Sequence, residues 1–313
     1  MRPGLGRHIL LRLLSGVFVL WGAATLCFLT VSLRGDTVGA ILGPGQPPTP
    51  ELRRQIIAEY GLDDPWLVQY GRRLRELLTG DLGWSYQRDQ PVARLLADQI
   101  GPTLQLAVAA ALLSVLLAVA ATLLTAGRGR LVRAAVSGLE LLAVSLPNFW
   151  VGTVLLALFS FTFPIFPAVG APGPAGLVLP AFALALPAAG VLAQVMRQEL
   201  ETAETRPFAV SVLARGAGLF HLRARHTLRH AALPVVTLSG WVLGSLAGGA
   251  VLIENIFARP GLGRLLASAA ASRDLPVVTA IVLLSAAAFV VINLVVDLLY
   301  PLIDPRLRAE AAR

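Results

Sequence analysis

The sequence predicts an all-α polytopic membrane protein with six transmembrane helices, on the evidence of its composition and its hydropathy pattern. Hydrophobic residues make up 56% of the 313 positions and charged residues 14%, whereas a soluble domain carries about 25% charged residues. Six stretches approach or exceed the roughly 20 apolar residues that cross a bilayer: Ile9–Leu33, Pro102–Leu124, Ala134–Phe163, Leu177–Met196, Leu233–Ile253 and Leu275–Leu299. The 26 basic residues are all arginine and, apart from Arg12, lie in the segments between these stretches or in the tails, which argues against an exposed nucleic-acid-binding face.

The first and third stretches have individual features. Ile9–Leu33 is interrupted only by Arg12 and is about twice as long as the apolar region of a secretion signal, so we expect an uncleaved first span. It contains the single cysteine, Cys27, so an internal disulfide is excluded. In the third stretch, Pro147 of "SLPNFWVG" lacks a backbone donor and predicts a kink or a break.

The arginines also predict the orientation, because positively charged short loops stay in the cytoplasm. The N-terminal tail, the 125–133 loop and the C-terminal tail hold three arginines each, and the 197–232 loop holds six. On the opposite side, the 164–176 loop has none and the 254–274 loop has three. Both termini are therefore expected in the cytoplasm.

The long outer segment 34–101 is expected to form two short amphipathic helices. Thr49-Pro50-Glu51 is typical of a helix start, and Gly61 and Gly80 are typical helix stops. Apolar residues recur between them at helical spacing. These helices would form a cap over the outer mouth of the bundle; a plain spacer is the alternative.

The 197–232 loop predicts a helix, a glycine turn and a second helix. The first helix is expected to present a small apolar face made of Ala209, Val212, Leu213, Gly216, Ala217 and Phe220. Gly216 and Gly218 permit a turn, Leu219–His230 forms the second helix, and Pro234 is expected in the first turn of the next span.

Three interpretations of this loop follow from the residues alone. Its arginines can bind anionic headgroups, at about 1 kcal/mol each. His226 and His230, four residues apart, have a metal-compatible spacing but no accompanying carboxylate or cysteine, so no metal site is predicted. The small-residue face around Ala214 and Gly216 suits docking onto a cytoplasmic partner.

At these residues the chain resembles a known family. "LARGAGLFHLRARHTLRHAALPVVT" is similar to the cytoplasmic loop of the membrane subunits of binding-protein-dependent ABC importers. "IENIFARPGLGRLL", "YGLDDPWLVQYGRRL", "GDLGWSY" and "SLPNFWVG" narrow the resemblance to the dipeptide, oligopeptide and nickel branch, over nearly the whole chain. The loop departs from the family where polar residues are usual ahead of the glycine, at Pro207, Phe208, Val210 and Leu213, and at His230, where asparagine is common.

The resemblance implies a permease subunit of the bacterial inner membrane, with a type I importer fold. Its ATPase-coupling contacts would be Ala214, Arg215, Gly216, Ala217 and Pro234. It further implies two cytoplasmic ATPase subunits or domains, a second paralogous permease and an external substrate-binding protein. No phosphate-binding loop is present, and without lysine none can form. ATP and magnesium would therefore bind the partner chains, this chain would hold no cofactor, and it would not itself be an enzyme.

The remaining candidate residues, for a translocation path or outer gate, are Pro147, Asn148, Glu254 and Asn255. A packing kink and an interfacial cap are the alternatives. Glu140 and Asp297 lie inside spans, and we expect them to pair with Arg133 or the C-terminal arginines. The predicted organisation is an N-terminal tail and first helix (1–33), the outer helical loop (34–101), a five-helix permease core (102–299) and a cytoplasmic tail (300–313).

The expected function is ATP-driven import of dipeptides or oligopeptides, with nickel or a metal chelate as the alternative cargo. A stand-alone ion-coupled transporter is the rival class; it predicts inverted repeats and midplane carboxylates, which the sequence does not show. A membrane enzyme would need a cluster of catalytic residues within the spans, and the sequence has none.

Overall fold

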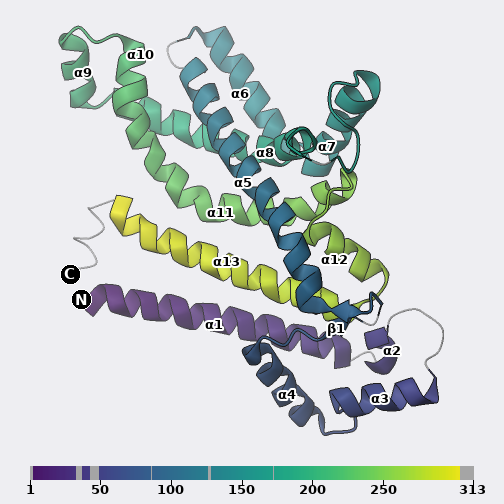
Figure 1. Cartoon of the computed structure of the whole chain (residues 1–313). Coiled ribbons are helices and arrows are strands. Elements are labelled where there is room, and N and C mark those ends of the chain that lie inside the picture. The colour runs from purple at the N-terminus through teal and green to yellow at the C-terminus, as the bar shows by residue number, and fades with distance from the viewer. Residues whose placement is uncertain are drawn as a thin grey trace. The chain divides into compact units, whose positions relative to one another are not determined.

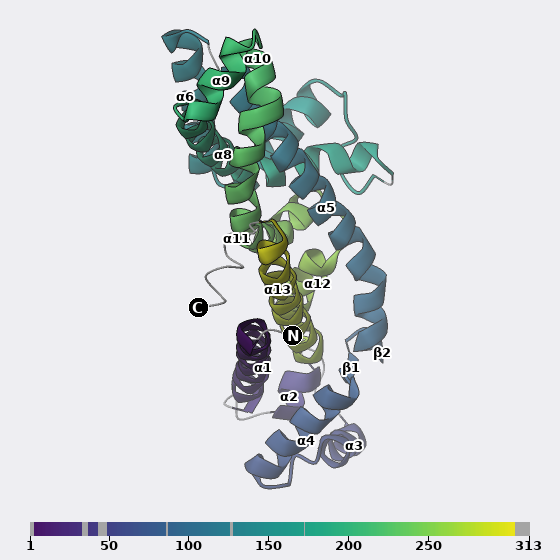
Figure 2. The same cartoon turned by 90° about the vertical axis from the view of Figure 1, so that its left-hand side faces the viewer.

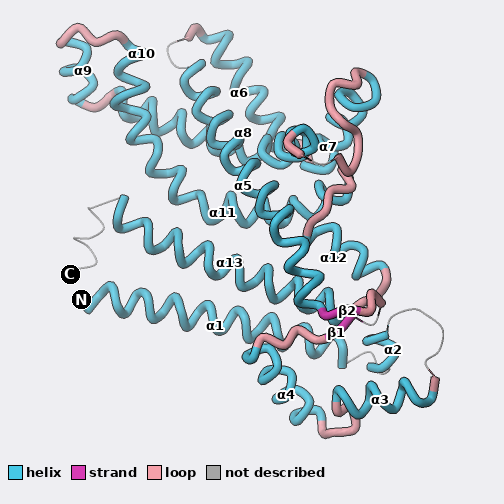
Figure 3. Tube along the Cα trace, in the orientation of Figure 1, coloured by secondary structure: helices cyan, strands magenta, loops and turns pink. Residues whose placement is uncertain are grey.

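The computed structural model describes residues 3–32, 37–42, 49–85, 87–125, 128–171 and 173–303. This part of the chain is almost entirely helical, with a small two-stranded hairpin (Figures 1 and 3). It divides into two compact units: unit 1 is Met1–Thr103 with Pro260–Leu294, and unit 2 is Leu104–Arg259 with Val295–Arg313. The predicted all-α class is confirmed.

Four helices of the described part are long and apolar enough to cross a bilayer. They are α1 (Pro3–Ser32), α5 (Val92–Thr125), α8 (Ala175–Glu204) and α13 (Leu275–Ile303). A fifth span results if α6 (Arg130–Ser145) and α7 (Asn148–Leu156), continued by the π-helical turn η1 (Ala157–Thr162), are counted together. In α11 (Leu228–Ile256), the apolar portion found is Gly240–Ile256, which is shorter than a span. The structure therefore supports a multi-span helical protein, and the number six stays a prediction.

The predicted break in the third stretch is confirmed. The helix of α6 ends at Ser145, α7 begins at Asn148, and the two segments are bent by 104°. Leu146 is extended, with φ −85° and ψ 130°, as expected of the residue before a proline. Pro147 thus turns the chain and does not merely kink one continuous helix.

The second span begins earlier than predicted, because α5 starts at Val92 and passes through Pro102. In unit 1, Val92, Leu95 and Leu96 are buried in a cluster with residues of α12 (Leu262–Ala271) and α13. This burial makes the amphipathic segment before Pro102 helical. The proline removes one backbone donor inside the helix without ending it.

The 34–101 segment of unit 1 contains α2 (Thr37–Leu42), α3 (Pro50–Tyr60), α4 (Trp66–Thr79) and the hairpin β1 (Trp84–Ser85) and β2 (Gln90–Pro91). Thr49 caps α3 by accepting a hydrogen bond from the Leu52 N–H at 3.3 Å. Gly61 and Gly80 end α3 and α4 with left-handed φ of 54° and 82°. The predicted start of α3 and the predicted stops of α3 and α4 are confirmed.

Within unit 2, α8 is the central helix, with alanines and leucines buried along most of its length. It packs against α6, α7 and α11. Gly190 permits the close approach of α6, because a Cβ atom there would lie 2.9 Å from the Glu140 carbonyl oxygen. This arrangement fixes both ends of α8, at which the two sites described below lie.

Candidate functional site

The predicted helix–turn–helix loop forms at the C-terminal end of α8. After Glu204, α9 (Pro207–Ala214) begins with a proline at its first position, where no backbone donor is needed. A glycine turn follows, and then α10 (Leu219–His221), the π-helical turn η2 (Leu222–Thr227) and α11 run on without interruption. Figures 1 and 2 both place α9 and α10 together at one end of unit 2.

Gly216 makes the turn between α9 and α10. Its φ is +85°, in the left-handed region that side chains other than glycine rarely adopt, and its N–H donates to the Leu213 carbonyl oxygen at 2.9 Å. Nothing lies within 4 Å of a Cβ atom built at this position. The turn is therefore exposed, and the predicted glycine turn at Gly216 is confirmed by its left-handed φ.

A bidentate ion pair fastens this loop to α8. Arg223 of η2 donates from Nε to Oε1 of Glu204 at 2.5 Å and from Nη2 to Oε2 at 3.1 Å. Arg223 is only 8% exposed, and its neighbours Leu222 and Thr227 are also buried. Two parallel bonds fix orientation as well as distance, so the outgoing and returning helices are held in one geometry.

Sequence reasoning missed this pair. It interpreted the arginines of this loop as headgroup ligands; of these, Arg225 is exposed, and the side chain of Arg229 lies outside the described residues. The available signal was weak, because Glu204 and Arg223 are 19 residues apart. Only the fold of the loop brings them together.

The apolar face differs from the prediction. Because α9 ends at Ala214, the positions from Gly216 onward do not continue its face, and Phe220 lies on the next helix. Ala209 is buried, whereas Val210, Leu213, Leu219 and Phe220 are exposed, Phe220 to 70%. We call these four residues, with Ala214, Arg215 and Gly216, the loop tip.

One further expectation for the loop was wrong. Pro234 does not lie in the first turn of a helix, because α11 already begins at Leu228 and is continuous with η2. The spacing of His226 and His230 is not tested, because the His230 side chain lies outside the described residues; the His226 ring centroid lies 5.8 Å from that of His221. The wider π-helical turn brings residues five apart over one another.

The expected pairing of Glu140 is confirmed, with a different partner. Glu140 is 5% exposed, and its Oε2 lies 2.7 Å from Nη1 of Arg197 on α8. Arg133, the predicted partner, instead pairs with Glu201, with 3.5 Å between its Nη1 atom and Oε1 of Glu201. Arg197 and Glu201 are four residues apart, so one face of α8 binds α6 through both pairs. The side chain of Asp297 lies outside the described residues.

The four candidate residues for the translocation path or gate lie at two places: Pro147 and Asn148 at the start of α7, and Glu254 and Asn255 near the end of α11. Asn148 lies against Gly249, because a Cβ atom there would be 2.6 Å from the Asn148 Nδ2 atom. Glu254 and Asn255 are in the last turn of α11, where Glu254 is fully buried and Asn255 is exposed. The structure places Asn148 beside α11, and the role of all four residues stays a prediction.

The sequence was compared with known proteins. Residues 114–309 match the family model described as binding-protein-dependent transport system inner membrane component. The chain is 37% identical over 312 residues to a putative peptide transport system permease protein of Brucella abortus, covering 96% of this chain and 99% of that protein. It is 32% identical over 314 residues to a probable peptide ABC transporter permease protein of Sinorhizobium fredii, covering 97% and 100%.

A glutathione transport system permease protein of Salmonella paratyphi A is 35% identical over 307 residues, covering 96% of this chain and 98% of that protein. The family model covers more than half of the chain, and the relatives are matched over nearly their full length. The chain belongs to the family of inner membrane components of binding-protein-dependent transport systems. It is a permease subunit of an ABC transporter.

Proposed function

We propose that this chain is the membrane-spanning permease subunit of an ATP-driven importer of dipeptides or oligopeptides. The relatives named as peptide permeases support this cargo. The peptide would be delivered by an external substrate-binding protein and would pass between this chain and a paralogous second permease. ATP hydrolysis would take place in two separate cytoplasmic ATPase subunits or domains.

The proposed topology has six spans with both termini in the cytoplasm. The arginine-rich 197–232 loop, with the loop tip, then faces the cytoplasm, whereas 34–101, the 164–176 loop and the 254–274 loop face outward. In this arrangement α2, α3, α4 and the β1–β2 hairpin form the outer insertion. The division into tail and first helix, outer loop, core and C-terminal tail follows from the same topology.

The loop tip carries the proposal of ATPase docking. It combines exposed apolar side chains, a glycine turn with open space around it and a rigid attachment to α8 through Glu204 and Arg223. An exposed apolar helix end suits insertion into a groove of a partner. Because the attachment is bidentate, movement of the partner would be transmitted to α8 and α11 and not absorbed by the loop.

Matched substitutions test this docking. Leu219→Ser and Phe220→Ser change exposed side chains of the loop tip, so the fold should remain while copurification with the partner ATPase falls about tenfold. Leu78→Ser, at an 88% exposed leucine of α4, is the control and should retain full binding. Normal ATPase copurification with both loop-tip variants would contradict the docking role.

Transport by the reconstituted importer tests the function itself. Uptake of a dipeptide into liposomes should require the binding protein, the ATPase and ATP. Uptake of a nickel chelate in place of the dipeptide would change the cargo. Uptake by this chain alone along an ion gradient would replace the importer by a secondary transporter.

A further inference from the structure

A second arginine, Arg259, lies near the N-terminal end of α8 and is nearly as buried as Arg223. Arg259 follows the end of α11 and is 9% exposed. Its Nη2 atom donates to Oε1 of Gln105 at 3.3 Å, and its Nε atom is buried without a hydrogen-bond partner. Among the described residues, no carboxylate lies within ion-pair distance of it. The local structure therefore buries a positive charge with only a neutral acceptor.

The end of α11 aims this side chain. Ala258 adopts a left-handed φ of 45°, and the Arg259 N–H donates to the Glu254 carbonyl oxygen at 2.9 Å. This bond closes the end of α11 and reverses the chain. The Arg259 side chain reaches Gln105 of α5 and is largely shielded from solvent.

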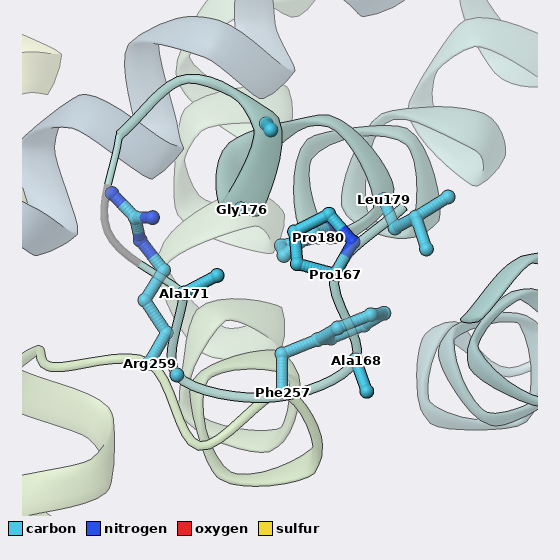
Figure 4. A pocket seen from close by; sticks show the side chains of 10 residues that line it. Pro167, Ala168, Ala171, Gly176, Leu179, Pro180, Phe257 and Arg259 are labelled. Atoms are coloured by element: carbon cyan, nitrogen blue, oxygen red, sulfur yellow. The ribbon is translucent and has the colours of Figure 1, made fainter. Parts of the chain in front are cut away.

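Arg259 borders a hollow at the start of α8 (Figure 4). In the view of Figure 4, Arg259 stands at one edge and Leu179 at the other, with Pro180, Pro167 and Phe257 between them. The hollow measures about 280 Å³ with its open mouth, and the centre of a water-sized group can occupy about 10 Å³ of it. A space of this size holds about one water-sized group, such as the oxygen of a carboxylate.

A second positive feature faces the same hollow. Ala175 and Gly176, the first residues of the 30-residue helix α8, line it, and Pro174 offers no side-chain cap. The first N–H groups of a helix have no partners within the helix, and the helix dipole places partial positive charge there. Arg259 and the start of α8 together favour an anion.

We propose that this hollow is a carboxylate-binding site, occupied by an acidic side chain of the substrate-binding protein when that protein docks. The inference rests on the proposed function, whose topology places this end of unit 2 on the outer face. The apolar walls suit the methylene group that carries a side-chain carboxylate. A docked protein also covers the open mouth, which strengthens the charge pair by excluding water.

The affinity of the binding protein for the assembled importer in nanodiscs tests the site. Arg259→Gln should weaken binding about tenfold and reduce its salt dependence, because one buried charge pair is lost. Arg259→Lys keeps the charge and should lose less than Arg259→Gln. Arg128→Gln, which removes an exposed arginine of the 125–133 loop on the proposed cytoplasmic side, is the control and should bind as wild type.

A competition on the wild-type importer avoids any folding defect of the variants. Propionate should weaken docking of the binding protein, whereas the neutral propionamide should not. Unchanged docking of Arg259→Gln, or equal effects of the two small molecules, would overturn the proposal.

Two other outcomes are distinguishable. If docking is insensitive to Arg259 while alanyl-alanine stabilises the importer and its C-terminal amide does not, the carboxylate belongs to the cargo and our assignment is wrong. If the wild-type assembly neither binds a binding protein nor takes up peptide, the proposed function fails, and the inference fails with it.

Discussion

A buried arginine lies near each end of α8, and the two differ in the partner of their guanidinium group. At the C-terminal end, Arg223 is neutralised by two bonds to Glu204. At the N-terminal end, Arg259 is equally buried but has the amide oxygen of Gln105 as its acceptor among the described residues. Breaking a buried ion pair is costly because the remaining charge loses its partner. Arg223 therefore has a structural role within the chain, whereas Arg259 is arranged to meet a carboxylate from outside it.

The largest expected effect on the free energy of unfolding comes from removing the Arg223–Glu204 ion pair. Arg223→Gln leaves the Glu204 carboxylate without its bidentate partner. We expect a loss of about 2 kcal/mol in stability, below the roughly 3–5 kcal/mol of fully buried pairs because Glu204 is partly exposed. Thermal unfolding of the purified chain measures it, with the Arg225→Gln variant, at an exposed arginine, as control. Equal melting temperatures for the two variants would show that the pair contributes nothing.

A smaller effect is expected at the unpaired end. Arg259→Gln removes a buried charge without leaving an opposite charge behind, so the isolated chain should change by less than about 1 kcal/mol. The same thermal unfolding measurement applies, in the absence of partners. A loss as large as that of Arg223→Gln would mean that Arg259 is neutralised within the chain.

The smallest effect concerns the backbone beside Arg259. Ala258 holds a left-handed φ of 45°, a conformation that glycine adopts without the steric cost. Ala258→Gly should therefore stabilise the chain by about 0.5 kcal/mol, since relief of strain exceeds the added entropy cost. Docking of the binding protein should be retained, because Arg259 keeps its position. A lower melting temperature would show that the turn is not strained.

Local chemistry made several elements predictable from the sequence. Thr49, Gly61 and Gly80 bound their helices through caps that act within a few residues. Pro147 breaks the third stretch and Gly216 makes the loop turn for equally local reasons, the first through a missing donor and the second through its left-handed φ.

Long-range packing accounts for what the sequence did not predict. Pro102 and Pro234 lie inside helices, because the preceding segments are helical and continue through them. The pairing of Glu140 with Arg197, and of Glu204 with Arg223, depends on how helices meet. The turn before Arg259 gave no signal, since its left-handed residue is an alanine.

Cross-linking at the loop tip tests the central claim most directly. In a Cys27→Ser background, Ala214→Cys supplies a single exposed thiol at the turn, and Leu78→Cys supplies one on α4 as control. A short bifunctional thiol reagent should join Ala214→Cys to a cysteine placed in the groove of the partner ATPase, and the yield should change with ATP. The Leu78→Cys control should give no product. Cross-linking of the control but not of Ala214→Cys would contradict docking through this loop.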